Sequence, residues 1–196
     1  GAKVHGISNK IPFKTSQFNK MNLEKIIKKS IMFDLINKEK LRKKIVHLKP
    51  DFIFHLAAQS LVGRSYLDPT LTWYSNTFGT INILEVLREV KRETVVVLIT
   101  SDKVYKNIET IKGYKEDDVI GGIDPYGASK AAAEIAIKSY ISSYFSNKNN
   151  KIYIGVARAG NVIGGGDWSE KRLIPDCMRA WLQGRKAIIR SPNSTR

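Results

Sequence analysis

The sequence predicts an α/β protein built around a doubly wound parallel sheet. Short apolar runs, many of them β-branched, alternate with amphipathic stretches along the 196 residues, as in repeated strand–helix–strand units. An apolar content of 42% and a charged content of 26% are typical of a globular chain, and the length suffices for one sizeable core. Because the apolar runs do not alternate with polar residues, the strands are expected to be covered on both faces.

The elements follow one another along the chain. The expected strands are residues 2–6, 30–33, 52–56, 95–100 and 152–158, and the expected helices are residues 38–47, 69–91, 125–146 and 174–184. Pro50 breaks the chain before the third strand, because the residue that precedes a proline is disfavoured in a helical conformation. Asp124 followed by Pro125 is typical of a helix start, with the aspartate as cap and the proline in the first turn.

One usual part of such a fold is not found in the sequence. A dinucleotide-binding Rossmann-like sheet opens with a strand, a glycine-rich turn and a helix that receives a pyrophosphate. Neither G-x-G-x-x-G nor G-x-x-G-x-x-G occurs here, and the first residue is Gly1. Because the first strand normally lies in the middle of the sheet, a sheet without it has a gap and two unpaired edges. We therefore expect a Rossmann-like fold that lacks its first βα unit, in a protein that continues beyond Arg196.

The formal net charge of +15 raises the question of a nucleic-acid partner. The first fifty residues carry 13 Lys or Arg against 3 acidic residues, and apolar residues recur among them at helical spacing. A solvated, lysine-rich helix face explains this pattern better than a nucleic-acid surface does. We expect no nucleic-acid partner, although a positive surface also attracts anionic ligands.

Other classes of protein are disfavoured by what the sequence does not contain. The longest purely apolar run, residues 95–99, is too short to span a bilayer, and no secretory leader is recognisable. Cys177 is the single cysteine, so it forms no internal disulfide, and no Cys/His cluster resembles a zinc site. We expect a cytoplasmic protein with neither a metal nor a membrane partner.

Tyr126 and Lys130 are four residues apart and share one face of an expected helix. A lysine ammonium beside a phenol favours the phenolate, which can remove a proton from a hydroxyl. Tyr144 and Lys148 have the same spacing, so spacing alone does not identify a site. Since Tyr126 follows a helix cap and Tyr144 precedes a polar loop, we interpret Tyr126 as functional and Tyr144 as structural.

A second polar group directly follows the apolar run of residues 95–99. In open α/β sheets, ligands bind at the carboxyl ends of the strands. Ser101, Asp102 and Lys103 place a hydroxyl, a carboxyl and an amine there, which can serve as hydrogen-bond donor, acid and base. A polar turn in which Asp102 acts as a cap is the alternative, and the residues alone do not decide between the two.

These residues resemble the extended short-chain dehydrogenase/reductase family. Ser101, Tyr126 and Lys130 are similar to its Ser/Thr-Tyr-Lys triad, residues 55–59 to its fourth-strand motif and residues 73–85 to the helix that follows. Further stretches resemble the nucleotide-sugar 4,6-dehydratase branch that acts on CDP-glucose: residues 101–103, 121–126, 158–168, 172–176 and 188–196. The resemblance spans residues 4–196, with small departures at Val104 and at Arg64.

The resemblance implies a lyase that binds NAD and converts CDP-glucose to CDP-4-keto-6-deoxyglucose and water. Tyr126 is implied to take the proton of the sugar O4 hydroxyl, with Lys130 supporting the phenolate and Ser101 hydrogen-bonded to O4. Asp102 is implied as the acid at the C6 hydroxyl. Lys103 stands where related enzymes have a glutamate. It is either the base for the C5 proton, which requires a neutral amine, or a charge that stabilises the enolate.

The resemblance also implies binding residues. For NAD these are Asp34, Leu35, Leu56, Ala57, Ala58, Ser75, Tyr126, Lys130 and Asn161, and for the sugar nucleotide Gln59, Ser101, Asn161, Arg172, Leu173 and Arg196. Taken alone, Asp34 can also be a helix cap and Ser75 a solvent-facing serine, and each arginine is more often a surface charge. Residues 1–160 are expected to form the NAD-binding domain and residues 161–196 the beginning of a substrate-binding region. The full-length protein is expected to be a homodimer or a higher homo-oligomer.

Three alternatives stay open. The protein could be another nucleotide-sugar dehydratase or a 4-epimerase, which has no need of the Asp102–Lys103 pair. It could be a non-catalytic remnant, since the phosphate-binding turn is not in the sequence. A basic nucleic-acid-binding protein is the third alternative, and its binding would depend steeply on salt.

Overall fold

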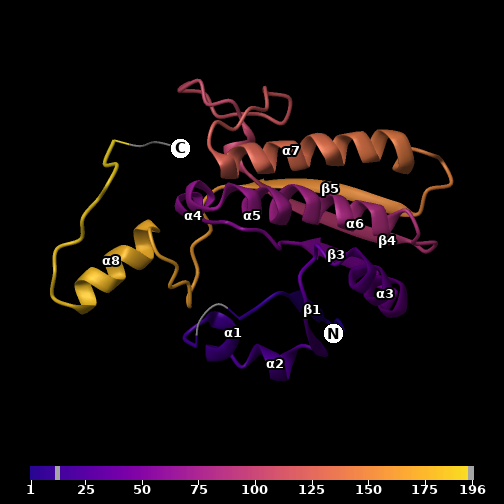
Figure 1. Ribbon diagram of the computed structural model, residues 1–196, viewed down its shortest axis with the longest axis horizontal. Helices are drawn as coiled ribbons and strands as arrows, with labels where there is room; N and C mark the ends of the chain where they lie inside the picture. The colour runs from indigo at the N-terminus through magenta and orange to yellow at the C-terminus, as the bar shows by residue number, and fades with distance from the viewer. Residues whose placement is uncertain (12–13, 194–196) are drawn as a thin grey trace. The chain divides into compact units, whose positions relative to one another are not determined.

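A computed structural model describes residues 1–11 and 14–193 and shows a parallel α/β architecture (Figure 1). The chain divides into a first unit, residues 1–32 with 162–196, and a second unit, residues 33–161. Within the described residues, five strands form two parallel sheets, β1-β2 in the first unit and β3-β4-β5 in the second. The predicted parallel α/β fold is therefore confirmed.

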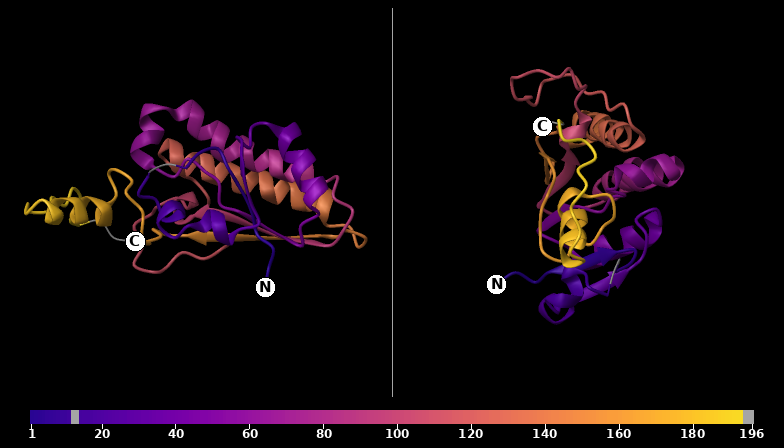
Figure 2. Two further views of the ribbon diagram at one scale, coloured as in Figure 1. Left: turned by 90° about the horizontal axis from the view of Figure 1, so that it is seen from below. Right: turned by 90° about the vertical axis from the view of Figure 1, so that its left-hand side faces the viewer.

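The second unit is a three-stranded sheet with helices on one face. Its strands are β3 (Phe52–His55), β4 (Thr94–Ser101) and β5 (Ile152–Ala159), with β4 in the centre. The helices that lie along the sheet are α5 (Pro69–Trp73), α6 (Gly79–Leu87) and α7 (Pro125–Tyr140), and α3 (Lys38–Leu48) packs against α6 (Figure 2). The carboxyl ends of β4 and β5 lie side by side, because Ser101 pairs with Ala159.

The two faces of this sheet have different surroundings within the unit. Val96 and Leu98 point to the helical side and are fully buried. On the opposite side Phe52, Phe54 and Tyr153 are more than half exposed. Within the second unit the helices thus cover one face of the sheet and not both.

Two long predicted helices are present but change their winding. The run of residues 69–87 passes from α5 through a π-turn, η1 (Tyr74–Phe78), into α6, and α7 continues into a second π-turn, η3 (Ile141–Phe145). A π-turn accommodates an extra residue in a helix and often occurs where a side chain is needed for another contact. Asn76 in η1 has such a role, because its fully buried amide bonds to groups outside its helix.

The helix-breaking and capping predictions are confirmed in the second unit. Helix α3 ends at Leu48, and Lys49 adopts a left-handed conformation before Pro50. Asp124 caps α7, and Pro125 is its first residue. The lysine-rich helix face is confirmed in α3, where Leu41 and Ile45 are buried while Lys38, Lys40 and Lys43 are exposed.

The first unit contains β1 (His5–Ser8), β2 (Lys29–Met32), α1 (Gln17–Lys20), α2 (Leu23–Ile26) and α8 (Leu173–Leu182). The strand predicted at residues 2–6 was placed too early, because pairing with β2 begins at His5. Helices α1, α2 and α4 (Val62–Leu67) were not predicted, since four to six residues are too few to show a helical period. Among the described residues no helix is long and apolar enough to cross a membrane, and no cluster of three metal-binding side chains occurs.

Candidate active site

The candidate site begins at the carboxyl end of β4. Ser101 is the last residue of the strand, and its buried hydroxyl donates to an Asp102 carboxylate oxygen at 3.0 Å and accepts from the backbone N–H of Lys103 at 3.2 Å. The hydroxyl thereby caps the single turn η2 (Asp102–Val104). A Cβ placed on Gly160 would lie 3.8 Å from the other Asp102 oxygen, so the chain leaving β5 passes beside this carboxylate. Ser101, Asp102 and Lys103 therefore lie at the carboxyl end of β4, which is where ligands bind in open α/β sheets.

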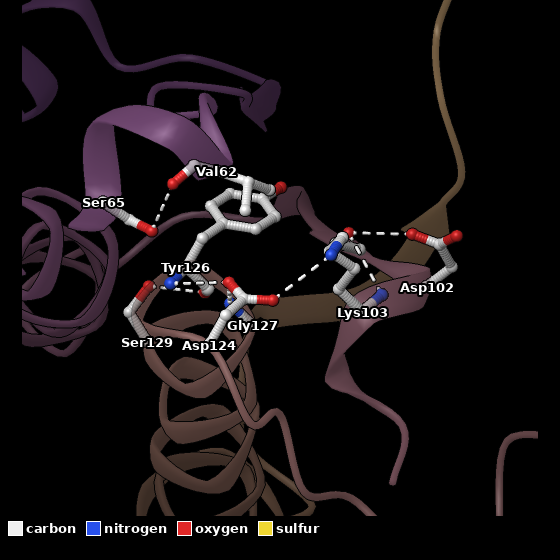
Figure 3. Close-up of polar contacts among 9 residues, drawn as sticks. Val62, Ser65, Asp102, Lys103, Asp124, Tyr126, Gly127 and Ser129 are labelled. Atoms are coloured by element: carbon white, nitrogen blue, oxygen red, sulfur yellow. Dashed lines mark hydrogen bonds and ion pairs between the residues drawn. The ribbon is translucent and has the colours of Figure 1, made fainter. Parts of the chain in front are cut away.

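Asp124 connects this strand end to the start of α7. Its Oδ1 accepts from the backbone N–H groups of Tyr126 and Gly127, both at 3.0 Å. Its Oδ2 lies 3.2 Å from the ammonium nitrogen of Lys103 (Figure 3). One carboxylate therefore caps the helix that carries Tyr126 and also binds the amine predicted to take part in the chemistry.

Two glycines let the backbones approach at this point. A Cβ on Gly122 would lie 2.1 Å from the carbonyl carbon of Gly127, closer than any real contact. A Cβ on Gly127 would lie 2.9 Å from the carbonyl oxygen of Lys103. The N–H of Gly121 also donates to the carbonyl of Val104 at 2.8 Å. The loop before α7 is thus interlocked with η2 through the backbone as well as through Asp124.

Tyr126 and Lys130 lie one turn apart at the start of α7. Lys130 is 5% exposed, and its ammonium donates to the carbonyl oxygen of Ile99 in β4 at 3.1 Å. Burial lowers the pKa of Lys130 to about 8, against the opposing effect of the Glu134 carboxylate. The Tyr126 ring projects from the start of α7 in Figure 3. The predicted phenol, amine and strand-end hydroxyl therefore belong to two directly joined segments.

A buried ion pair anchors α7 to the sheet beyond Lys130. Glu134 is 6% exposed and receives the Arg158 guanidinium from β5, with nitrogen–oxygen distances between 2.6 and 3.0 Å. Thr100 of β4 donates to the same carboxylate at 2.5 Å. This pair raises the pKa of Arg158 through its hydrogen bonds to Glu134. The helix that carries Tyr126 is thus fixed to both β4 and β5.

A buried polar network fixes the same helix on its other side. The Asn76 amide donates to the carbonyl of Gln59 at 3.1 Å and to the hydroxyl of Ser129 at 2.9 Å, and its oxygen accepts from the N–H of Gln59 at 2.8 Å. Ser129 in turn donates to the carbonyl of Tyr126 at 2.7 Å. The Gln59 side chain bonds to Leu61 and to a threonine of α5, so it takes part in this network. The network connects the chain after β3 to the residue that precedes Lys130.

His55, the last residue of β3, is neutral. Burial, together with the nearby Lys130 ammonium, lowers the pKa of His55 to about 4. Its Nε2 lies 3.1 Å from the hydroxyl of Thr80, which already donates to the carbonyl of Asn76. The Thr80 oxygen must then accept from His55, so Nε2 carries the ring proton. His55 therefore holds α6 against the sheet and does not carry a charge at neutral pH.

The predicted cofactor residues belong to the second unit. Tyr126 and Lys130 lie in α7 and Ser75 in η1, and the others lie in loops. Asp34 closes a turn after β2, accepting the N–H of Ile36 at 3.0 Å, and Asn82 of α6 donates to the carbonyl of Leu35 at 2.9 Å. Leu56 and Ala57 are exposed just beyond β3, whereas Ala58 is partly buried. Ser75 is half-buried in η1, and Asn161 is exposed two residues beyond β5.

The predicted substrate residues beyond Asn161 belong to the first unit. Arg172 pairs with Asp167 at 3.2 Å, and Leu173 is 54% exposed at the start of α8. Arg196 lies outside the described residues. The roles of these three residues stay predictions.

Sequence reasoning missed several residues that build the site. Asp124 was expected as a helix cap only, and Asn76, Ser129 and Glu134 were not expected to take part. Their common sign in the structure is a polar side chain that is at least nine-tenths buried. In the sequence, polar residues stand among small apolar ones within the expected helices. That pattern indicates buried polar side chains, but it does not show which groups they contact.

The chain was compared with known proteins. The model of the family described as GDP-mannose 4,6 dehydratase matches residues 1–188. Among curated proteins, the chain is similar to the CDP-glucose 4,6-dehydratase of Salmonella typhimurium, with 42% identity over all of this chain and 55% of that protein. The chain thus spans about half the length, or less, of the curated relatives that it matches first.

Solved structures show the same fold. Pal from Bacillus thuringiensis matches 92% of this chain and 56% of its own with a TM-score of 0.79 and 25% identity. DesIV from Streptomyces venezuelae, a dTDP-glucose 4,6-dehydratase solved with NAD and DAU bound, matches 93% of this chain and 53% of its own with a TM-score of 0.78 and 21% identity. The Rossmann-like arrangement expected from the sequence is therefore confirmed.

Proposed function

Since the chain belongs to the GDP-mannose 4,6-dehydratase family, we propose that it functions as an NAD-dependent nucleotide-sugar 4,6-dehydratase that acts on CDP-glucose. One observation carries the proposal: the end of β4, with Ser101 to Lys103, is tied through Asp124 to the helix start that bears Tyr126 and Lys130. This joins a phenol, two amines, a hydroxyl and a carboxyl at the edge of a parallel sheet. The likeness to the Salmonella enzyme supports CDP-glucose as the substrate.

The residues at the strand ends fit a nicotinamide dinucleotide. Lys130 is buried, yet its ammonium has one hydrogen-bond partner among the described residues, the carbonyl of Ile99, so two N–H groups suit ligand hydroxyls. The small side chains of Ala57 and Ala58, just after β3, leave room for the ribose and pyrophosphate of a dinucleotide to approach the chain. We assign cofactor contacts to Asp34, Leu35, Leu56, Ala57, Ala58, Ser75, Tyr126, Lys130 and Asn161. Bound NAD would supply the reversible oxidation of the sugar at C4, with the electrons returned at C6.

Tyr126 acts as the general base for the O4 hydroxyl in this proposal. The Lys130 ammonium favours the phenolate, and Ser101 orients O4 by a hydrogen bond. Once C4 is a ketone, the C5 proton is acidified and passes to a base, either a neutral Lys103 amine or the Asp102 carboxylate, and the C6 hydroxyl leaves as water. Asp102 supplies the proton that the leaving hydroxyl needs, from a carboxyl already positioned by Ser101.

The nature of the reaction is tested by its product. The protein incubated with NAD and CDP-glucose is expected to form a 4-keto-6-deoxy sugar nucleotide, which is detected by the absorbance of the keto sugar in alkali. dTDP-glucose, UDP-glucose and GDP-mannose at equal concentration are the comparison substrates. Faster turnover of one of these would overturn the choice of CDP-glucose, and no keto product from any of them would overturn the dehydratase proposal.

We also propose that the enzyme is a cytoplasmic homodimer or higher homo-oligomer. The single cysteine, Cys177, is buried and unpaired, which suits a reducing compartment. Leu71, Tyr74 and Phe78 are 37–50% exposed along α5 and η1, a helical face suited to a second copy. Light scattering measures the mass, and a monomer over the working concentration range would contradict the proposal.

A further inference from the structure

The two oxygens of the Asp124 carboxylate bind different partners. Oδ1 accepts the N–H groups of Tyr126 and Gly127 at 3.0 Å, which is the work of a helix cap. Oδ2 is not needed for the cap and faces the ammonium of Lys103 at 3.2 Å (Figure 3). Asp124 is 8% exposed, so this oxygen would be costly to bury without a cationic partner.

The ion pair is not what holds the two segments together. The backbone of Gly127 lies so close to Lys103 and to Gly122 that neither glycine has room for a Cβ. The hydrogen bond from Gly121 to Val104 fixes the same contact at 2.8 Å. Removal of the charge on Oδ2 should therefore change the position of the Lys103 amine more than the path of the backbone.

Of the carboxylates on η2 and at α7, Asp124 is the one that determines the position of the Lys103 amine. Among the described residues, Asp124 is the partner in the one ion pair that Lys103 makes. Asp102, its neighbour in η2, accepts the Ser101 hydroxyl, and Glu134 of α7 is taken up by Arg158. The amine is thereby held on the α7 side of η2, at the helix start that carries Tyr126.

We propose that Asp124 is a positioning residue, which holds the Lys103 ammonium at the site so that its charge acts on the enolate during elimination. This inference rests on the proposed dehydratase function. An ammonium has no lone pair, so in this role Lys103 stabilises negative charge, and the C5 proton passes to the Asp102 carboxylate, which returns it to the leaving C6 hydroxyl. Of the two roles that the sequence left open for Lys103, the geometry thus favours the electrostatic one.

Asp124→Asn separates the two tasks of the side chain. Asparagine keeps a cap oxygen for the helix but replaces the charged oxygen by an amide N–H₂. We expect product formation to fall about 10-fold or more while C4 oxidation, read from reduced nicotinamide absorbance in a single turnover, changes less than about 3-fold. Asp68→Asn is the matched control, because Asp68 caps α5 through the N–H of Leu71 and lies outside the proposed site. Asp124→Ser, which also caps but is uncharged, is a second variant with the same expected result.

Two further measurements separate positioning from folding. In a Lys103→Met background, Asp124→Asn should lower product formation by less than about 2-fold more, because both changes remove one interaction. In the chain without substrate, NMR should show a slowly exchanging Lys103 ammonium signal that Lys103→Met and Asp124→Asn both abolish and that Asp68→Asn retains.

The possible outcomes separate the positioning role of Asp124 from the dehydratase function on which it rests. An active protein in which Asp124→Asn forms product as fast as the unsubstituted protein, or loses oxidation and elimination equally, overturns the positioning role and leaves the dehydratase intact. A protein that makes no keto product from any sugar nucleotide overturns both.

Discussion

The two ends of the helical run from Pro125 to Phe145 carry the same Tyr–Lys spacing and differ in their surroundings. At the start, Tyr126 follows a buried carboxylate cap, and Lys130 is 5% exposed with its ammonium on a strand carbonyl. At the end, Tyr144 is 49% exposed in a π-turn and packs beneath the Arg88 guanidinium, 4.1 Å from the ring centre. Lys148 follows in an exposed loop.

The difference teaches that topology, and not spacing, gives this motif its chemistry. In a parallel α/β unit a helix begins near the carboxyl ends of the strands and runs back along the sheet. The start of α7 therefore meets the polar residues that follow β4, while η3 lies near the opposite ends of the strands. Burial lowers the pKa of Lys130, at the start of α7, to about 8.

Loss of one phenol at each end gives the largest expected contrast. Tyr126→Phe should lower product formation about 1,000-fold, because it removes the group that accepts the O4 proton. Tyr144→Phe removes the same oxygen from a packing residue and should leave the rate within about 2-fold, as expected for a surface change. Steady-state product assays on both variants make the comparison, and equal losses would mean that the two tyrosines had been assigned wrongly.

The interlocked backbone at the helix start gives the next largest effect. Gly122→Ala places a Cβ 2.1 Å from the carbonyl carbon of Gly127, and the forced movement should lower the free energy of unfolding by about 3 kcal/mol. Gly155→Ala in β5 adds the same atom where nothing lies within 4 Å and is the control. Urea unfolding of both variants measures the difference. Similar stabilities would show that the loop before α7 is free to shift.

The buried lysine at the helix start predicts a pH dependence of stability. Burial lowers the pKa of Lys130 from 10.5 to about 8, so between these values the unfolded state binds more protons than the folded state. The free energy of unfolding should therefore rise between pH 8 and pH 10, by roughly 2 kcal/mol for this group. Lys130→Met should remove this rise and Lys148→Met should retain it. Denaturant unfolding at the two pH values checks the sign, and a rise that survives Lys130→Met would contradict the assignment.

The smallest effect is expected at the far end of the helical run. Arg88 lies over the Tyr144 ring and pairs with Glu85 at 2.8 Å, but its side chain is 41% exposed. Arg88→Met should lower the thermal unfolding temperature far less than Gly122→Ala does, because solvent screens exposed pairs. Thermal unfolding measures it. A loss as large as that of Gly122→Ala would mean that this end is more important to stability than the site end.

The sequence predicted the features that depend on local chemistry. The five strands, the capped start of α7 and the polar end of β4 follow from apolar runs, from Asp124-Pro125 and from Ser101 to Lys103. In a parallel α/β fold, the carboxyl ends of the strands and the starts of the helices lie at the same edge of the sheet. The sequence therefore also predicts that the end of β4 and the start of α7 meet. The fold class and the meeting of the β4 end with the start of α7 could thus be predicted from the sequence, while the roles of the site residues stay predictions.

What the sequence could not predict depends on which segments meet in three dimensions. Oδ2 of Asp124 binds Lys103, which lies 21 residues away in the chain, and local sequence does not reveal this contact. Asn76 and Ser129, 53 residues apart, become one network because η1 turns the amide toward α7. The need for glycine at position 122 similarly arises only when Gly127 packs against it.

Isotope exchange at C5 tests the central claim most directly. If the groups from Ser101 to Lys103 and from Tyr126 to Lys130 oxidise C4 and eliminate water, CDP-glucose turned over in D₂O should yield a 4-keto-6-deoxy product with deuterium at C5. Mass spectrometry and proton NMR of the isolated product locate the label. A 4-epimer that retains its original C5 proton and C6 hydroxyl would contradict the account.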